Sequence, residues 1–187
     1  NFVLALIETA QKNPRSIIVP KVYLYHDPKR LESAGYREFR WGLGSIGVGE
    51  GEIDSGQYDV QRELPLAMTA TLVENKFFAD IGFLDEVNLP LYGADNDFTL
   101  RARKKGYRII FEPKSFFWHK RHTTAGKSVK QFSSLFAKLR FLLVDIKSPV
   151  NWRVQRKLTF SYYPFYKIPF RLLFYSYAVL VQLFSRQ

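Results

Sequence analysis

The sequence predicts an α/β protein, because strand-like and helix-like patterns alternate along its first 120 residues. Apolar runs typical of buried strands occupy 17–24, 64–74, 107–113 and 115–120. Helical patterns that end at a glycine occupy 75–82 and 98–105. The chain has 187 residues, of which 47% are hydrophobic and 24% charged, so a disordered chain is excluded. It has no cysteine, which excludes a disulfide scaffold, a thiolate zinc site and a cysteine nucleophile.

The N-terminal segment predicts a helix followed by a strand. Residues 2–12 form an amphipathic pattern that ends near Asn13 and Pro14. We do not expect this segment to be a signal peptide, because Glu8 interrupts its apolar run. A chain that begins inside an element is expected to be a fragment. In the strand at 17–24, Pro20 indicates an edge position or a bulge. We expect a turn or short helical piece at 26–33 and a weak strand at 35–41.

A glycine-rich segment at 42–59 predicts a long loop. Its first glycines spell G-x-G-x-x-G, with Glu63 about 20 residues further on, as in a dinucleotide-binding fingerprint. That fingerprint needs a helix to open at the third glycine, and VGEGEIDSGQYD cannot start one, so this interpretation is rejected. We expect a flexible lid instead, containing Gly42, Gly44, Gly47, Gly49 and Gly51.

The formal net charge of +11 is concentrated in the C-terminal third. Residues 1–119 carry 15 Lys and Arg against 16 acids, whereas residues 120–187 carry 13 Lys and Arg and a single acid, Asp145. The second segment also holds 14 of the 31 aromatic residues. The asymmetry predicts two parts, 1–125 and a basic aromatic tail at 126–187, and an anionic partner for the tail.

The spelling of the tail favours a membrane surface as that partner. The longest uncharged run in 164–186 is 14 residues, and a spanning helix needs about 20. Tyr, Trp, Lys and Arg beside helix-length apolar blocks, such as 132–146, are typical of interfacial helices. Packing of these helices on the first part is the alternative interpretation, and nucleic acid is the least favoured partner.

Two clusters combine titratable groups. The first, Y-G-A-D-N-D at 92–97, lies at a loop-to-helix junction, where Asp95 or Asp97 could cap the helix or act as a general base. The second, W-H-K-R-H at 118–122, follows a predicted strand, so His119 could be a metal ligand or part of a solvated basic loop. His26, next to Asp27 in a turn, is expected at the surface.

An ordered series of motifs runs through residues 63–120. After a strand with small residues come the turn F-L-D-E at 83–86, G-A-D-N-D-F-T-L-R at 93–101, R-K-K-G-Y-R at 103–108, and then Pro113 and His119. This series resembles the acceptor-side half of family 2 inverting glycosyltransferases, in the rhamnosyltransferase-like group of the GT-A fold. The upstream glycine-rich loop and its G-Q-Y-D ending are similar too, so the resemblance covers about residues 1–125.

The resemblance implies a role for each matching residue. Asp95 matches the catalytic base that deprotonates the acceptor hydroxyl, and His119 matches a histidine that completes a divalent metal site, for Mg²⁺ or Mn²⁺, on the donor diphosphate. An inverting transfer needs a base on one side of the sugar and a cation near the leaving group on the other. Acceptor-side or supporting positions are Ala94, Asn96, Asp97, Arg101, Thr69 and Ala70.

Three departures from the family pattern accompany this resemblance. Ala94 stands where the family has a glutamate, and Thr69 stands where it often has a glycine. No Asp-x-Asp precedes His119 except Asp95–Asp97, which lies in the wrong element, so the nucleotide-binding half is expected to be missing. This chain alone is therefore expected to be inactive. A non-catalytic relative that kept the fold is the alternative, and Ala94 favours it.

The intact enzyme is then expected to be a hexosyltransferase-type transferase of cell-envelope polysaccharide biosynthesis. It would move a sugar from a nucleotide-sugar donor to a glycan or lipid-linked acceptor at the cytoplasmic face of the cell membrane. The basic tail would hold it against the anionic membrane surface, where a lipid-linked acceptor lies.

Overall fold

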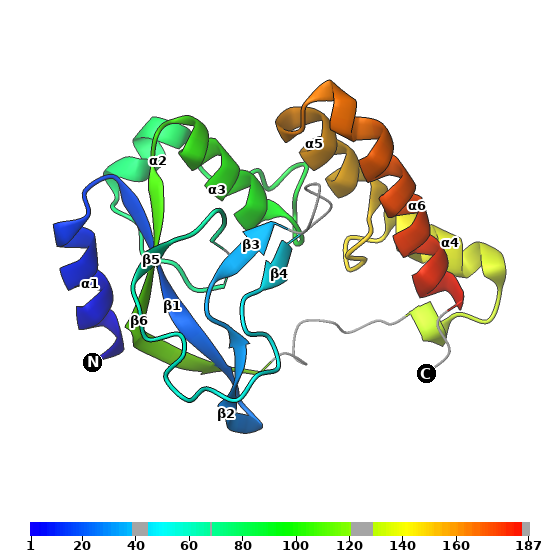
Figure 1. Cartoon of the computed structure of the whole chain (residues 1–187). Coiled ribbons are helices and arrows are strands. Elements are labelled where there is room, and N and C mark those ends of the chain that lie inside the picture. Colours follow the sequence, from blue (N-terminus) through cyan, green and yellow to red (C-terminus); the bar gives the residue numbers. More distant parts are fainter. Residues whose placement is uncertain (39–44, 68, 121–128, 185–187) are drawn as a thin grey trace. The chain divides into compact units, whose positions relative to one another are not determined.

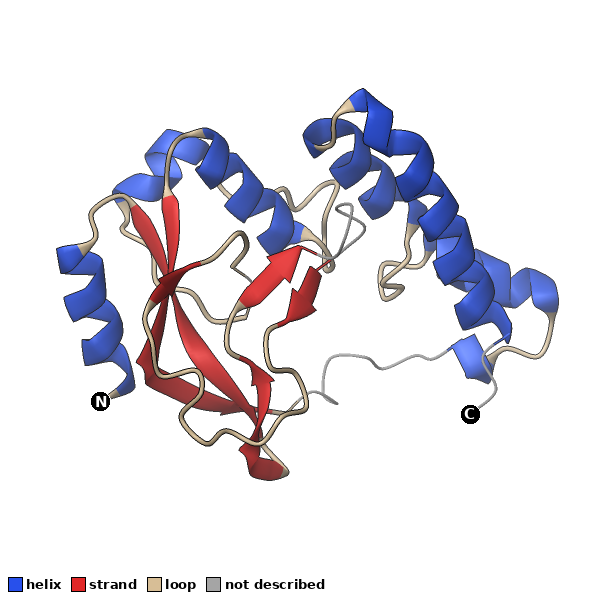
Figure 2. Cartoon of the chain, viewed as in Figure 1, coloured by secondary structure: helices blue, strands red, loops and turns tan. Residues whose placement is uncertain are grey.

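The computed structural model describes residues 1–38, 45–67, 69–120 and 129–184 (Figure 1). It confirms the α/β class, with a mixed four-stranded sheet that contains one parallel pair, and with helices at the C-terminal end (Figure 2). The chain divides into two compact units. The first unit comprises Asn1–Phe39, Gly44–Phe83 and Phe98–Arg121, and the second comprises Arg40–Leu43, Leu84–Asp97 and His122–Gln187.

The main sheet lies in the first unit and has the strand order β2-β1-β6-β5. Its strands are β1 (Ser16–Leu24), β2 (Asp27–Ser33), β5 (Arg62–Glu63) and β6 (Arg108–His119). The central pair, β1 and β6, is parallel, and the two outer pairs are antiparallel. A separate two-stranded sheet pairs β3 (Tyr36–Glu38) with β4 (Ser45–Gly47).

Helices cover both faces of this sheet, because successive residues of a strand point to opposite sides. On one face, α1 (Phe2–Lys12) packs Leu6 against Ile18 and Ile110. The other face packs against α2 (Lys76–Ile81) and the part of α3 (Ala94–Lys104) that begins at Phe98. The buried residues on that second face include Ile17, Val19, Phe77, Ile81, Phe98, Ala102 and Phe111.

Pro20 lies in the interior of the sheet, so the bulge predicted there is present and the edge position is not. The register of the β1–β6 pair shifts after Pro20, which pairs with Glu112, while Lys21 pairs with Phe116. Strand β6 therefore has three extra residues, 113–115, opposite this step. The two short strands predicted at 107–113 and 115–120 are one long strand that contains this irregularity.

Two predicted elements are wrong. Residues 26–33 form β2, which returns along β1 as a hairpin, rather than a turn or helical piece. The described positions of 64–74 form no regular strand. Ala70 has a φ of +53°, which interrupts an extended backbone, and the segment joins neighbouring strands only through the single bridges Leu66–Tyr36 and Leu72–Ile18. Of the weak strand expected at 35–41, the described residues form β3, and residues 39–41 lie outside the described ranges.

The second unit is helical. Its elements are η3 (Val129–Gln131), α4 (Leu135–Val144), α5 (Trp152–Tyr162), η4 (Phe165–Lys167) and α6 (Ile168–Phe184). Phe141, Leu142, Val150 and Val179 form its main core. Asn151 connects α4 to α5, since its Nδ2 donates to Val144 O at 2.9 Å while its Oδ1 accepts from Arg153 N at 2.9 Å.

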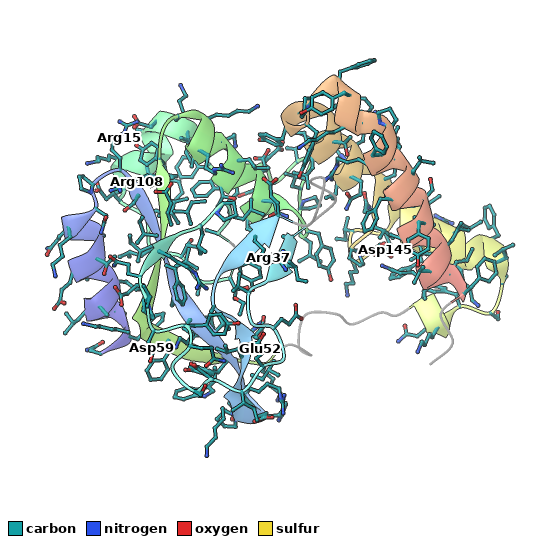
Figure 3. All side chains as sticks on the ribbon, viewed as in Figure 1. Arg15, Arg37, Glu52, Asp59, Arg108 and Asp145 are labelled. Carbon is teal, nitrogen blue, oxygen red and sulfur yellow. The ribbon has the colours of Figure 1, made fainter. Side chains whose placement is uncertain are left out.

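Helix α6 exposes a continuous apolar stripe. Its exposed large side chains recur at helical spacing on one face, namely Phe170, Leu173, Tyr177, Leu180, Val181 and Phe184. Asp145, the one acid of the tail, lies at the C-terminal end of α4 (Figure 3). Among the described residues, no helix combines the length and the apolar character that crossing a bilayer requires.

Candidate functional site

The predicted catalytic residue, Asp95, and the predicted supporting residues Asn96 and Asp97 lie in the first turn of α3, which begins at Ala94, four residues earlier than expected. Asp95 and Asp97 are therefore inside the helix rather than before it, where their charges suit the positive end of the helix dipole. The helix follows Gly93, whose φ of +81° is a left-handed conformation that favours glycine. This turn belongs to the second unit up to Asp97.

Asp95 has the property that a general base requires. Its side chain is half-buried, and its Oδ1 accepts a hydrogen bond from the backbone N–H of Asn96 at 2.9 Å. Burial raises the pKa of the Asp95 carboxyl above its ordinary value, and the bond from Asn96 opposes this only in part. A carboxylate with raised proton affinity accepts a proton from a hydroxyl group more readily.

Asp97 has a different, structural environment. It is 1% exposed, and its Oδ1 accepts a hydrogen bond from the hydroxyl of Tyr162 on α5. Its backbone N–H donates to Gly93 O at 2.9 Å. Asp97 therefore ties the start of α3 to the end of α5.

Ala94 and Gly93 allow α5 to approach closely. Ala94 packs beside a cluster of Leu89, Val154 and Leu158. A Cβ added at Gly93 would lie 2.9 Å from Val154 Cγ1 and 3.1 Å from Leu158 Cδ1. The small side chain at position 94 thus matches the apolar face of α5, and a glutamate there would bring a carboxylate into this apolar contact.

Arg101, on the same helix, lies in the first unit and connects α3 to the end of α2. Its guanidinium donates to the carbonyl oxygens of Ile81 and Phe83, the latter at 2.8 Å. It also lies 5.6 Å from the centroid of the Phe98 ring. These contacts fit the helix-anchoring position that the resemblance implies for Arg101.

His119 ends β6 in the first unit and is oriented by Glu32 of β2. The Nδ1 of His119 lies 2.9 Å from Glu32 Oε2 and 3.0 Å from Oε1, and the Glu32 side chain is 5% exposed. A carboxylate on Nδ1 favours the tautomer that carries its proton there, which leaves the Nε2 lone pair available to a ligand.

His119 is oriented as one metal ligand, but the described residues around it do not form a complete metal site. Within the described ranges, no group of three or more His, Asp or Glu side chains could hold a metal ion. Carboxylate-oriented histidines are common metal ligands, whereas Mg²⁺ and Mn²⁺ are held mainly by oxygen atoms. Of the described residues, His119 could therefore contribute one nitrogen to such an ion.

The remaining predicted residues that the structure describes lie in the first unit. Thr69 Oγ1 is 3.4 Å from the hydroxyl of Tyr36. The backbone of Ala70, rather than that of Thr69, has a left-handed conformation, with a φ of +53°. Gly47 ends β4, and Gly49 and Gly51 lie in the turns that follow it, whereas Gly42 and Gly44 lie outside the described residues. No helix follows Gly47, in agreement with the rejected dinucleotide fingerprint.

A buried charge network, which the sequence did not reveal, holds the glycine-rich loop. Lys21 is 2% exposed, and its Nζ lies 2.7 Å from Asp54 Oδ2 and 2.5 Å from Asp59 Oδ1. Asp59 lies in the loop beside β2 (Figure 3). Burial lowers the pKa of Lys21, but its bonds to both carboxylates outweigh burial and hold that pKa above the ordinary value. The flexibility predicted for this loop stays a prediction, although this network anchors its last third.

The structure brings some predicted residues together and adds two that were missed. Asp95, Asn96 and Asp97 share one helical turn, whereas His119 belongs to the other unit. The missed residues are Glu32, which is 87 positions from its partner His119, and Tyr162, which is 65 positions from Asp97. Both act through pairings between distant segments, so no local spacing could have indicated them.

Comparison with known proteins adds no family to these observations. No protein-family model matches the sequence, and no curated protein matches it either.

Proposed function

We propose that this chain is the acceptor-side part of an inverting glycosyltransferase of the GT-A fold, in which Asp95 is the general base. The observation that carries the proposal is the Asp95 carboxyl in the first turn of α3, where burial raises its pKa. The motif at 93–101 and the α/β sheet with a parallel pair support the same assignment. In this proposal, Asp95 accepts the proton of an acceptor hydroxyl as that oxygen attacks the donor sugar.

Three further residues have supporting roles in this proposal. Asp97 keeps the turn in place through Tyr162, and Asn96 donates the backbone hydrogen bond that orients the Asp95 carboxylate. His119 would supply one nitrogen to a divalent cation, and the other ligands would come from outside the described residues. When bound, Mg²⁺ or Mn²⁺ would neutralise charge on a nucleoside diphosphate leaving group.

The acceptor is proposed to be a glycan or a lipid-linked saccharide at an anionic membrane surface, on the cytoplasmic side. Support comes from the exposed apolar stripe of α6 and from the excess of Lys and Arg in residues 120–187. An apolar helix face flanked by cations is the pattern of a helix that lies in the plane of a membrane interface.

The test of the transfer reaction uses the full natural protein that contains this chain. Asp95→Asn keeps the size of the side chain but removes the base, so we expect transfer to fall by about 10²–10⁴-fold while nucleotide-sugar binding is kept. Glu86→Gln, which removes a charge from an exposed side chain in the preceding loop, is the matched control. Transfer that survives in Asp95→Asn at the rate of Glu86→Gln overturns the assignment of the base.

A second function, a non-catalytic binding module of the same fold, is favoured by Ala94. The apolar packing of Ala94 against α5 shows a position adapted to helix contact. If the protein is such a module, Asp95→Asn leaves saccharide binding unchanged, and the natural protein releases no nucleoside diphosphate from any nucleotide-sugar tested.

A further inference from the structure

Helix α5 presents a pocket that none of the roles above uses. The pocket encloses about 340 Å³ and lies wholly within the second unit. It is lined by Asn88, Arg153, Arg156, Lys157, Phe160 and Ser161. The five lining residues of α5 recur every three or four positions, so they share one helix face, next to the face that packs on Leu89. A volume in this range suits a small ligand or the head of a larger one.

The pocket concentrates positive charge. Three of its six lining residues are cations and none of the six is an acid. Arg153 and Arg156 are exposed, and no acidic side chain within the described ranges lies within 4 Å of either guanidinium. Two guanidinium groups without a carboxylate partner leave ten N–H donors in planar forks available to an anion.

The remaining cation is held in position from the loop before α3. Lys157 Nζ lies 3.4 Å from Asp85 Oδ2, and the same carboxylate accepts from Asn88, with the Nδ2–Oδ2 distance at 2.9 Å and the N–Oδ1 distance at 3.0 Å. Asp85 thus fixes both a lysine and an asparagine at the wall of the pocket. A pocket whose donors are already positioned loses less entropy when a ligand binds.

From these contacts we propose that the α5 pocket binds a phosphate group, with Arg153 and Arg156 as its main ligands. A phosphate monoester or diphosphate carries more than one negative charge and three or more acceptor oxygens, which matches several convergent cations better than one carboxylate does. Lys157 adds a third cation to the donor set, and the exposed Phe160 ring forms an apolar edge. This inference goes beyond the proposed transfer reaction, since phosphate binding requires no catalytic base.

The test measures binding of inorganic pyrophosphate to the 187-residue chain by calorimetry at an ionic strength of about 0.15 M, where the Debye length is about 8 Å. We expect saturable binding at one site, and a loss of affinity of at least about tenfold in Arg153→Ala/Arg156→Ala, because charge-assisted hydrogen bonds are removed. The matched control is Arg140→Ala/Lys147→Ala, which removes the same charge from exposed positions in and after α4. Its affinity should stay within about twofold, because distant exposed charges are screened by salt.

Several outcomes would overturn the proposal. These are equal pyrophosphate affinity in the wild type and the pocket variant, an equal loss in the control variant, or tighter pocket-dependent binding of an oligonucleotide. Arg153→Lys/Arg156→Lys keeps the charge, so it should recover part of the affinity, and unchanged far-ultraviolet circular dichroism establishes that each variant is folded. Asp95→Asn should bind pyrophosphate like the wild type, which separates this inference from the transfer proposal.

A second arm identifies the source of the phosphate. Vesicles of phosphatidylcholine with phosphatidic acid, which bears a phosphate monoester, are compared with vesicles that contain phosphatidylserine at the same surface charge. A preference for phosphatidic acid that the pocket variant loses assigns the site to a lipid-borne phosphate. Equal binding to both vesicles, with pocket-dependent pyrophosphate binding kept, assigns it to a soluble phosphate compound.

Discussion

The hydroxyl of Tyr162 donates a hydrogen bond to the buried carboxylate of Asp97, and this contact joins the end of α5 to the first turn of α3. The turn that holds Asp95 therefore depends on a helix more than 60 residues later in the chain. Helix α5 therefore stabilises the turn that carries the proposed base, in addition to the helices of the tail itself.

Tyr162→Phe should lower the free energy of unfolding. The change removes one donor from a carboxylate that is 1% exposed, and the loss of one buried hydrogen bond of this kind costs about 1–3 kcal/mol. Urea unfolding followed by fluorescence measures the effect. Tyr166→Phe, at an exposed position, is the control and should change stability by less than about 0.5 kcal/mol. Equal stability of the two variants would show that the bond to Asp97 contributes nothing.

Gly93→Ala should destabilise the protein more than Gly106→Ala does. Both glycines have φ close to +80°, so both substitutions carry the strain of a left-handed residue, about 1–2 kcal/mol. Only at Gly93 would the new Cβ also meet α5, at Val154 and Leu158, whereas nothing lies within 4 Å at Gly106. Thermal unfolding of both variants isolates the contribution of this close approach, and an equal loss at both positions would argue against tight packing of α5 there.

Glu32→Gln should change the tautomer of neutral His119. In the wild type, the carboxylate accepts the Nδ1 proton, so the Nδ1–H form should predominate. An amide can pair with either form, so the variant should show a mixture. Nitrogen chemical shifts of the ring report the tautomer, and the exposed His26 in the same spectrum is the internal reference. Identical ring shifts for His119 in both proteins would mean that Glu32 does not orient it.

Stability should decrease at alkaline pH. Burial and the bond to Asp54 raise the pKa of Tyr23 to about 12, and Lys21 also has a raised pKa. The folded state therefore keeps these protons after the unfolded chain has lost them, so stability is complete below about pH 10 and is lost as the pH rises to 12. Urea unfolding from pH 9 to 12 measures this slope.

Tyr23→Phe is the variant that tests this explanation, with Tyr25→Phe, at an exposed position, as the control. Removing this hydroxyl should reduce the alkaline slope, of which Tyr175 keeps a part because burial raises its pKa to about 12 as well, whereas the control should keep the full slope. At the acid end, burial opposes ionisation of Asp54, but hydrogen bonds from Lys21 and Tyr23 outweigh burial and lower its pKa. The contribution of Asp54 to stability is therefore present at neutral pH and is lost as the pH falls below about 4. An unaltered alkaline slope in Tyr23→Phe contradicts the assignment.

Elements with a strong local signal could be predicted from the sequence. The helix at 2–12 has clear periodicity and ends at Asn13, and α2 ends at Gly82, which adopts the φ of +77° expected of a terminating glycine. Strand β2 was missed because Asp27 and Pro28 are typical of turns. Its pairing with β1 is set by the hairpin rather than by its composition.

The candidate site was predictable only where its residues are neighbours in sequence. The G-A-D-N-D motif places Asp95 and Asp97 on one turn, but nothing local distinguishes the half-buried base from the buried anchor. That difference comes from the contact of Asp97 with Tyr162, and the orientation of His119 comes from Glu32. Both partners lie in other elements, so three-dimensional pairing had to be known first.

The three extra residues of β6 determine which side of the sheet His119 faces. Phe111 lies in the core with Phe77, whereas Phe117, an even number of residues later, has its ring 5.8 Å from that of Phe2 on α1. In a regular strand, residues separated by an even number share a side. The insertion therefore shifts the phase of the strand by half a period, and the residues after it pair with β1 in the register that sets His119 opposite Leu24. His119, on which the motif series ends, is thus positioned by the number of residues in this insertion. Substitutions leave that number unchanged, whereas a single-residue deletion alters it.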